Sequence, residues 1–226
     1  MRRKETDMIN VAIDGPAGAG KSTIARKAAH DLGYIYVDTG AMFRAMALYM
    51  VRNGIDPEDS EAVAKRADRA EIDITYIDGV QCVMLDGENV NGLIRTDEIS
   101  DAASRVAVVP EVRKKMLSLQ REIARKHDVI MDGRDIGSAV LPDADLKIYL
   151  TASVDVRADR RYRENIEKGM QADLEDIKRE IRERDERDMT RAEAPLVKVE
   201  DAVEVDSSDM TVAEVVDKIE SLIKSI

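Results

Sequence analysis

The chain has 226 residues, of which 44% are hydrophobic and 36% charged, and its formal net charge at pH 7 is −11. This length suits one substantial core with at most a grafted subdomain. An acidic surface repels polyphosphate backbones, which argues against general nucleic-acid binding. No apolar run approaches the roughly 20 residues of a membrane span, and the basic start is not followed by a signal-peptide pattern. We therefore expect a cytoplasmic protein with no membrane partner.

The start of the chain predicts a parallel α/β arrangement. Residues 8–13 are typical of a buried strand, 15–20 form a glycine-rich loop, and 21–32 form a helix that ends at Gly33. A second short strand is expected over 34–37. Strand, loop, helix and strand at this spacing are typical of a parallel sheet that is covered by helices.

The middle of the chain departs from this pattern. After a helix over 41–54, a shorter helix is expected with Ser60 as its N-cap. Apolar and polar residues then alternate, and Asp-Gly pairs at 78–79 and 86–87 are strong signals for hairpin turns. We therefore expect a small antiparallel insertion in the parallel fold.

The second half of the chain returns to helices and buried strands. Pro110 suits the first turn of a long helix, and an arginine-rich, charged segment covers residues 155–191. The remaining elements are two apolar strands, a last strand and an amphipathic closing helix, expected over 128–132, 146–150, 202–206 and 211–226.

A phosphate-binding loop lies between the first strand and the first helix. Gly15, Gly20, Lys21 and Ser22 satisfy the pattern G-x-x-x-x-G-K-[ST]. The glycines let the backbone wrap a phosphate so that its N–H groups point inward, and the helix that follows presents its positive end. Lys21 can reach the outer phosphates, and the Ser22 hydroxyl suits a magnesium ion that is bound with the nucleotide.

The loop alone does not show what happens to the phosphate. A guanine-reading Asn-Lys-x-Asp is absent, since no asparagine is followed by lysine, and no second signature of a motor or transporter ATPase is visible. A small kinase fits the length better. A regulatory protein that hydrolyses ATP without transferring the phosphate stays open as an alternative.

Arginines follow two of the predicted strands directly. Thr39 and Arg44 come after the second strand, and Arg134 with Asp135 after a later one. Ligands bind at the carboxyl ends of parallel strands, so a second phosphate held by arginine forks is expected there. A phosphate monoester is mostly dianionic at pH 7 and needs no general base. An alcohol acceptor would favour a carboxylate base such as Asp132 or Asp135, so a sugar or shikimate-type kinase stays open.

Five segments in a fixed order resemble the bacterial-type cytidylate kinases, a family of nucleoside monophosphate kinases. They are IDGPAGAGKST, YVDTGAMFRAMAL, IRTDEISDAASRVAVVPEVR, DGRDIG and RERDERDMTRAEAPL, and the resemblance covers nearly the whole chain. It implies a P-loop kinase fold, in which helices flank a five-stranded parallel sheet. It also implies a monophosphate-binding insert of antiparallel strands and helix over 39–110, a core over 8–38 and 111–226, and a short helical lid within about 157–191.

The resemblance also implies the reaction and the residues that perform it. ATP with Mg²⁺ would pass its terminal phosphoryl group to CMP or dCMP, as part of pyrimidine nucleotide metabolism and in a monomeric enzyme. Lys21, Arg44 and Arg134 would be catalytic, and Ser22 would bind the metal. The expected ATP contacts are Gly15, Pro16, Ala17, Gly18, Ala19, Gly20, Lys21, Ser22, Thr23 and the lid arginines Arg157, Arg160 and Arg161.

The expected CMP contacts divide by the part of the nucleotide that they would bind. Thr39, Arg44 and Arg134 would hold the acceptor phosphate, and Arg184 with Asp188 would contact the ribose. Cytosine offers an amino donor and two acceptors, which suits carboxylate, hydroxyl and guanidinium partners. The residues expected around the base are Ser104, Arg113, Asp135 and Arg191.

Overall fold

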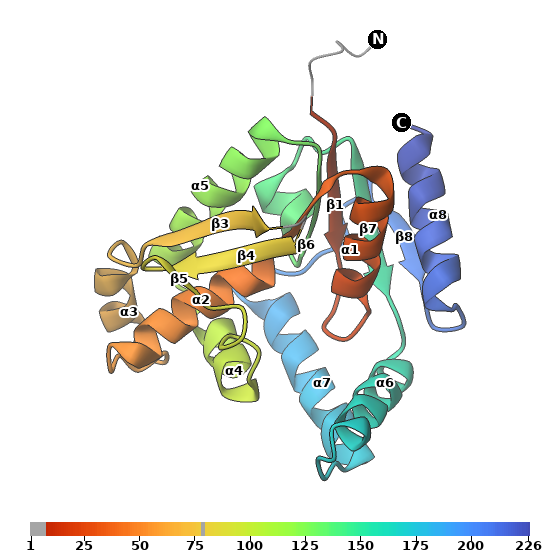
Figure 1. Ribbon diagram of the computed structural model, residues 1–226. Coiled ribbons are helices and arrows are strands. Elements are labelled where there is room, and N and C mark those ends of the chain that lie inside the picture. Colours follow the sequence, from red (N-terminus) through yellow and green to blue (C-terminus); the bar gives the residue numbers. More distant parts are fainter. Residues whose placement is uncertain (1–7, 78–79) are drawn as a thin grey trace. The chain divides into compact units, whose positions relative to one another are not determined.

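The computed structural model describes residues 8–77 and 80–226, and the chain divides into two compact units (Figure 1). One unit comprises Ile35–Val129, and the other comprises Ile9–Tyr34 with Ile130–Ile226. None of the helices formed by the described residues is both long enough and apolar enough to cross a membrane.

A five-stranded sheet has the order β2-β6-β1-β7-β8, which confirms the predicted sheet. Its strands are β1 (Asn10–Asp14), β2 (Ile35–Asp38), β6 (Val129–Gly133), β7 (Leu146–Thr151) and β8 (Val203–Asp206). β7 pairs in parallel with both β1 and β8, with Ile148 opposite Ile13 and Val203. Ile13 is fully buried and Ile148 almost so. Strands that are covered on both faces require such continuous apolar runs, and these were the runs that predicted the sheet.

The unit that contains the phosphate loop also contains four helices. They are α1 (Lys21–Leu32), α6 (Val154–Glu167), α7 (Leu174–Thr190) and α8 (Val212–Lys224). α1 packs against α8, and α6 lies beside α7 in a helical hairpin (Figure 1). α1 ends at Gly33 with a φ of 73°, as predicted. A π-helical turn, η1 (Ile136–Val140), follows β6.

The other unit combines helices with a small antiparallel sheet, which confirms the antiparallel strands predicted for the middle of the chain. The sheet has the order β3-β4-β5, and the turn between β4 and β5 has φ values of 49° at Asp86 and 82° at Gly87. The predicted turn at 86–87 is thereby confirmed, whereas the one at 78–79 lies outside the described residues. The elements are α2 (Thr39–Arg52), α3 (Ser60–Ala67), β3 (Ile72–Ile77), β4 (Val80–Leu85), β5 (Glu88–Asn89), α4 (Asp97–Val106) and α5 (Pro110–Lys126).

The N-cap predicted for the short helix α3 was wrong by one residue. Asp59, not Ser60, caps it, because the Asp59 carboxylate accepts a hydrogen bond from the Ala62 backbone N–H at 3.0 Å. Both residue types are good caps, and the choice depends on which of them has non-helical backbone angles. The predicted first-turn position of Pro110 in α5 is confirmed.

Candidate functional site

The phosphate loop connects β1 to α1, and its glycines are required by the backbone. Gly15 has a φ of 148°, and a Cβ atom there would lie 1.9 Å from the Leu150 carbonyl oxygen on β7. Gly20, with a φ of 87°, is the N-cap of α1. No larger residue fits at the first position without moving β7, so the loop can approach the sheet this closely only with glycine.

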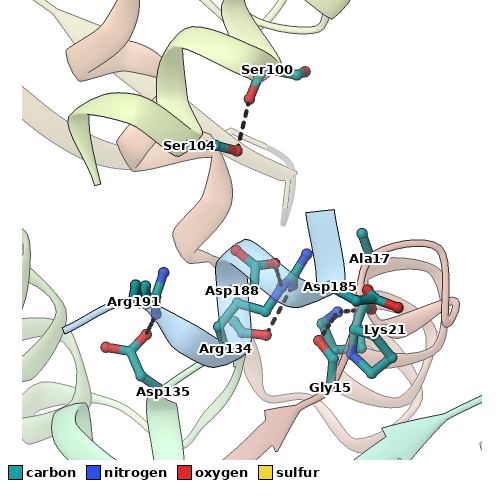
Figure 2. Close-up of polar contacts among 12 residues, drawn as sticks. Gly15, Ala17, Lys21, Ser100, Ser104, Arg134, Asp135, Asp185, Asp188 and Arg191 are labelled. Carbon is teal, nitrogen blue, oxygen red and sulfur yellow. Dashed lines mark hydrogen bonds and ion pairs between the residues drawn. The ribbon is translucent and has the colours of Figure 1, made fainter. Parts of the chain in front are cut away.

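Lys21 lies buried at the start of α1 and turns back onto the loop. Its ammonium group donates hydrogen bonds to the carbonyl oxygens of Gly15 and Pro16, both at 2.8 Å (Figure 2). Burial holds the pKa of Lys21 well below its usual value, and the positive charge of Arg134 lowers it further, while Asp132 opposes the shift. An anion at this position would stabilise the charged form of the lysine.

Ser22, which follows this lysine in the chain, forms a hydrogen bond with Asp132, so that two side-chain oxygen atoms lie close together. The Ser22 hydroxyl donates to Asp132 Oδ2 at 2.9 Å, and Asp132 is buried on β6. Magnesium prefers oxygen ligands and is commonly held by one or two carboxylates together with nucleotide phosphates. These two side chains therefore fit a magnesium ion that arrives with a nucleotide.

Arginines of the same unit are held by carboxylates at the end of β6 and along α7. Arg134 Nε donates to Asp188 Oδ2 at 2.9 Å, and Arg191 Nη2 lies 3.7 Å from Asp135 Oδ1 (Figure 2). Burial alone would raise the pKa of Asp188, but the attraction of Arg134 and then of Arg184 outweighs it, so that this pKa is lowered. The carboxylates thus orient the guanidinium groups that the resemblance assigns to CMP.

Arg184 carries positive charge that its surroundings compensate only in part. Burial, followed by repulsion from Arg134, lowers its pKa to about 10. Its Nε is buried and has no hydrogen-bond partner among the residues that the structure describes. A buried donor without a partner is costly, so an incoming acceptor group such as a ribose hydroxyl or a phosphate oxygen would be favoured here.

Asp14 is a further buried carboxylate at the end of β1, and sequence reasoning gave it no role. It accepts hydrogen bonds from the backbone N–H groups of Ile136 and Gly137 at 2.8 and 2.7 Å. Burial raises its pKa to about 6, these two hydrogen bonds oppose the rise, and Asp135 adds to it. Asp14 therefore connects the strand before the phosphate loop to the backbone that follows Asp135.

The three lid arginines that were expected to contact ATP have protein partners. Arg157 is buried and bonds Asp185, while Arg160 Nη2 donates to the Ser207 carbonyl oxygen at 2.8 Å. Arg161 Nη1 lies 3.3 Å from Glu180 Oε2. ATP contacts by these arginines stay predictions.

In the other unit, Thr39 and Arg44 lie in the first turns of α2. Arg44 Nη2 lies 3.1 Å from Asp38 Oδ2, and Asp38 also caps α2 by accepting from the Ala41 N–H. Arg95, which sequence reasoning did not single out, approaches the same carboxylate at 3.9 Å. The Arg44 Nε is buried and, within 8–77 and 80–226, has no hydrogen-bond partner. Arg44 and Arg95 can therefore both receive an anion in place of Asp38.

Ser104 and Arg113, which were expected near the base, are also in this unit. The Ser104 hydroxyl donates to the Ser100 carbonyl oxygen at 3.3 Å within α4 (Figure 2). Arg113 donates to the Ala107 carbonyl oxygen at 3.0 Å and lies 5.7 Å from the ring centre of Phe43. Both side chains are oriented by their own unit, and their contact with a base stays a prediction.

The structure thus groups the expected residues by unit. Lys21, Arg134, Arg184 and Asp188 influence one another electrostatically in one unit, and Thr39, Arg44, Ser104 and Arg113 belong to the other. Sequence reasoning named Asp135 and Asp188 as CMP contacts but did not predict that they hold Arg191 and Arg134. It missed Asp185 and Asp38. Asp185 could have been noticed, because it and Asp188 are three residues apart on a helix and so share a face.

Nearly the whole chain is similar to proteins of one known family. A family described as cytidylate kinase matches residues 11–225. A cytidylate kinase from Lactobacillus johnsonii is 50% identical over 96% of this chain and 94% of its own length. One from Caldicellulosiruptor bescii is 48% identical over 93% of each chain. An uncharacterized protein from Eubacterium ventriosum, 14% identical, shares the fold with a TM-score of 0.56 over 97% of this chain and 100% of its own.

Proposed function

Since the chain belongs to the cytidylate kinase family, we propose that it transfers the terminal phosphoryl group of ATP to CMP or dCMP. The products would be ADP and CDP or dCDP, which belong to pyrimidine nucleotide metabolism. The observation that supports this most directly is the family membership over residues 11–225. The structure is consistent with it, because Lys21 is buried on the phosphate loop and Arg134, at the end of β6, is held by Asp188.

Charge neutralisation and alignment would carry the reaction. Lys21 and the loop N–H groups hold the outer phosphates of ATP, while Arg44 and Arg134 hold the phosphate of the acceptor. That acceptor oxygen is already ionised at neutral pH, so no side chain has to remove a proton. The remaining task is to overcome repulsion between two anions and to align them, which is the usual basis of enzymatic phosphoryl transfer.

Magnesium would be held together with the nucleotide by Ser22 and, next to it, Asp132. When bound, the ion would supply charge that offsets the negative charge of the phosphates. The hydrogen bond of 2.9 Å between these two side chains keeps both oxygens together. Asp132 thereby orients the serine hydroxyl before any ligand arrives.

The residues expected around the acceptor base and ribose carry complementary hydrogen-bonding groups. Asp135 and Ser104 suit the cytosine amino group, Arg113 and Arg191 suit its acceptor atoms, and Arg184 with Asp188 suit the ribose. Residues 39–110 would serve as the monophosphate-binding insert of a core formed by 8–38 and 111–226. The lid within 157–191 would close over ATP and exclude water as a competing acceptor. We expect the enzyme to act as a monomer.

A panel of acceptors tests this function. The purified protein is supplied with ATP, Mg²⁺ and one acceptor at a time (CMP, dCMP, UMP, AMP or shikimate), and ADP release is measured with the phosphorylated product. We expect fast ADP release with CMP and dCMP only, with one CDP or dCDP formed for each ADP. ADP and free phosphate formed at the same rate without any acceptor would instead support the hydrolytic alternative.

A further inference from the structure

Arg157 is buried in the unit that holds the phosphate loop, and sequence reasoning placed it among the ATP contacts. It forms an ion pair with Asp185 and hydrogen bonds to Ala17 and Ala152. Its guanidinium donates four hydrogen bonds, to the Ala152 and Ala17 carbonyl oxygens at 2.9 and 3.0 Å and to both carboxylate oxygens of Asp185 at 3.1 and 2.6 Å. The side chain of Arg157 is 5% exposed and that of Asp185 13%. A guanidinium has five N–H donors, so most of them are used inside the protein.

The contact with Ala17 acts on the shape of the phosphate loop. In a trans peptide the C=O and the following N–H point in opposite directions. A fixed Ala17 carbonyl oxygen therefore also fixes the direction of the Gly18 N–H, one of the loop groups available to a phosphate. The aliphatic part of Arg157 supports the same peptide, since a Cβ atom on Gly18 would lie 3.4 Å from Arg157 Cβ.

The contact with Asp185 connects this loop to the helix that carries acceptor-binding residues. Asp185 follows Arg184 directly on α7 and lies three residues before Asp188, which bonds Arg134. Figure 2 shows Asp185 on the side of α7 near Ala17, and Asp188 beside Arg134. A bidentate carboxylate–arginine pair allows little rotation or sliding, so the position of α7 and the position of the loop are set together.

We propose that Asp185 and Arg157 are positioning residues, whose ion pair aligns the ATP-binding loop with the acceptor-binding residues of α7. Neither side chain has to touch a substrate for this role. The proposal rests on the proposed function, because misalignment matters only if a phosphoryl group passes from the loop to an acceptor. Removing this ion pair would keep every residue that binds a substrate, but these residues would no longer be held in the correct relative positions.

The test compares Asp185→Asn and Arg157→Lys, singly and together, by measuring kcat and KM for CMP and for ATP. Asn keeps the shape of Asp185 without its charge, and Lys keeps the charge of Arg157 without its fork. We expect each single variant to lower kcat/KM for CMP about tenfold or more, since small misplacements are costly in aligned reactions. The double variant should lose no more kcat/KM for CMP than the more impaired single variant, because either single change already breaks the ion pair.

The matched control is Asp155→Asn, which makes the same chemical change in another ion pair between α6 and α7. Asp155 Oδ1 lies 2.9 Å from Lys178 Nζ, and the side chain of Asp155 is 75% exposed while that of Lys178 is 18% exposed. We expect its kinetic constants to stay within about twofold of the wild type, because Asp155 is exposed and Lys178 keeps Glu175 as a partner at 3.0 Å. Thermal unfolding is followed for every variant, and kinetics are measured well below the unfolding temperature. Should Asp185→Asn not fold, Asp185→Glu with Arg157→Lys gives the same comparison with both charges kept.

Two results would overturn the proposal. In the first, the unfolding temperature of Asp185→Asn falls while kcat/KM stays normal, which would make the pair merely structural. In the second, Arg157→Lys raises only the KM for ATP while Asp185→Asn changes nothing, which would make Arg157 a direct ATP ligand. A wild-type protein that does not phosphorylate CMP would contradict the proposed function instead, so the two failures are distinguishable.

Discussion

The phosphate loop and helix α7 both hold buried positive charge, and they compensate it differently. In the loop, the Lys21 ammonium group is bound by two carbonyl oxygens, which carry no net charge. Beside α7, Arg134 is bound by the carboxylate of Asp188. An arriving phosphate therefore stabilises the charge of Lys21 most. Beside α7, the carboxylates stabilise the arginine charges even when no phosphate is bound. Changes in the loop should affect mainly catalysis, and changes on α7 should affect stability and acceptor binding.

The largest effect is expected from removal of the loop cation. Lys21→Ala should lower kcat for CMP-dependent ADP release about a hundredfold or more, because charge stabilisation in the transition state is lost. Its thermal unfolding should stay close to that of the wild type, since the hydrogen bonds that Lys21 donates go to two backbone carbonyl oxygens. Lys27→Ala, which removes an exposed lysine of the same helix, serves as the control. Near-normal turnover in Lys21→Ala would contradict the expectation that changes in the phosphate loop affect mainly catalysis.

A smaller effect, confined to the acceptor, is expected at the end of β6. Asp135→Ala should weaken CMP binding about tenfold to a hundredfold, the range for losing a hydrogen bond to a charged group. ATP binding to the same variant is the internal control and should change far less. Calorimetric titration with each nucleotide measures both. Equal losses for ATP and CMP would count against a base-reading role for Asp135.

On α7, the comparison predicts a loss of stability. Asp188→Asn removes the charge that faces Arg134 and Arg184, and we expect the free energy of unfolding to fall by about 2 kcal/mol at pH 7. The pKa of Asp188 is lowered from 3.8, so its contribution is present above about pH 4 and is lost as the pH falls through the folded-state pKa. Denaturant unfolding of both proteins from pH 7 to pH 3 checks this. A difference that persists unchanged at pH 3 would argue against the electrostatic explanation.

The smallest effect is expected at Asp14. Its contribution to the free energy of unfolding should increase as the pH falls, whereas that of Asp188 should decrease. Because its pKa is raised to about 6, the folded protein binds a proton more tightly than the unfolded chain between about pH 4 and pH 6. The wild type should therefore gain about 1 kcal/mol of stability relative to Asp14→Asn as the pH falls from 7 to 5. Denaturant unfolding at the two pH values measures the gain. A wild type that loses stability relative to the variant over this range would refute the prediction.

The comparison also shows how far sequence reasoning reached. The phosphate loop was predicted in place because eight contiguous residues specify it and because its ligands are backbone groups that depend on glycine. The end of α1 was also predicted correctly, because a glycine readily adopts the left-handed backbone conformation that ends the helix at Gly33. The cap of α3 was missed by one residue, since Asp59 and Ser60 are both good caps and only the backbone angles decide between them.

The partners of the arginines could not be predicted in this way. Arg157 and Asp185 are 28 residues apart in sequence, and Arg134 and Asp188 are 54 apart. In a chain with 46 acidic residues and 35 Lys and Arg, many such pairings are chemically acceptable. Nothing local distinguishes the pair that we propose to align two substrates from another pair between α6 and α7, such as Asp155 and Lys178.

The sequence by itself determined the phosphate loop, the parallel sheet, the antiparallel insertion and the family, because these depend on short-range backbone preferences, on the period of apolar residues and on contiguous motifs. Only the tertiary structure decided which carboxylate holds which guanidinium, and that Asp14 is buried against the backbone after Asp135. These contacts depend on burial and on distances between segments far apart in the chain, and both exist only once the strands and helices have packed.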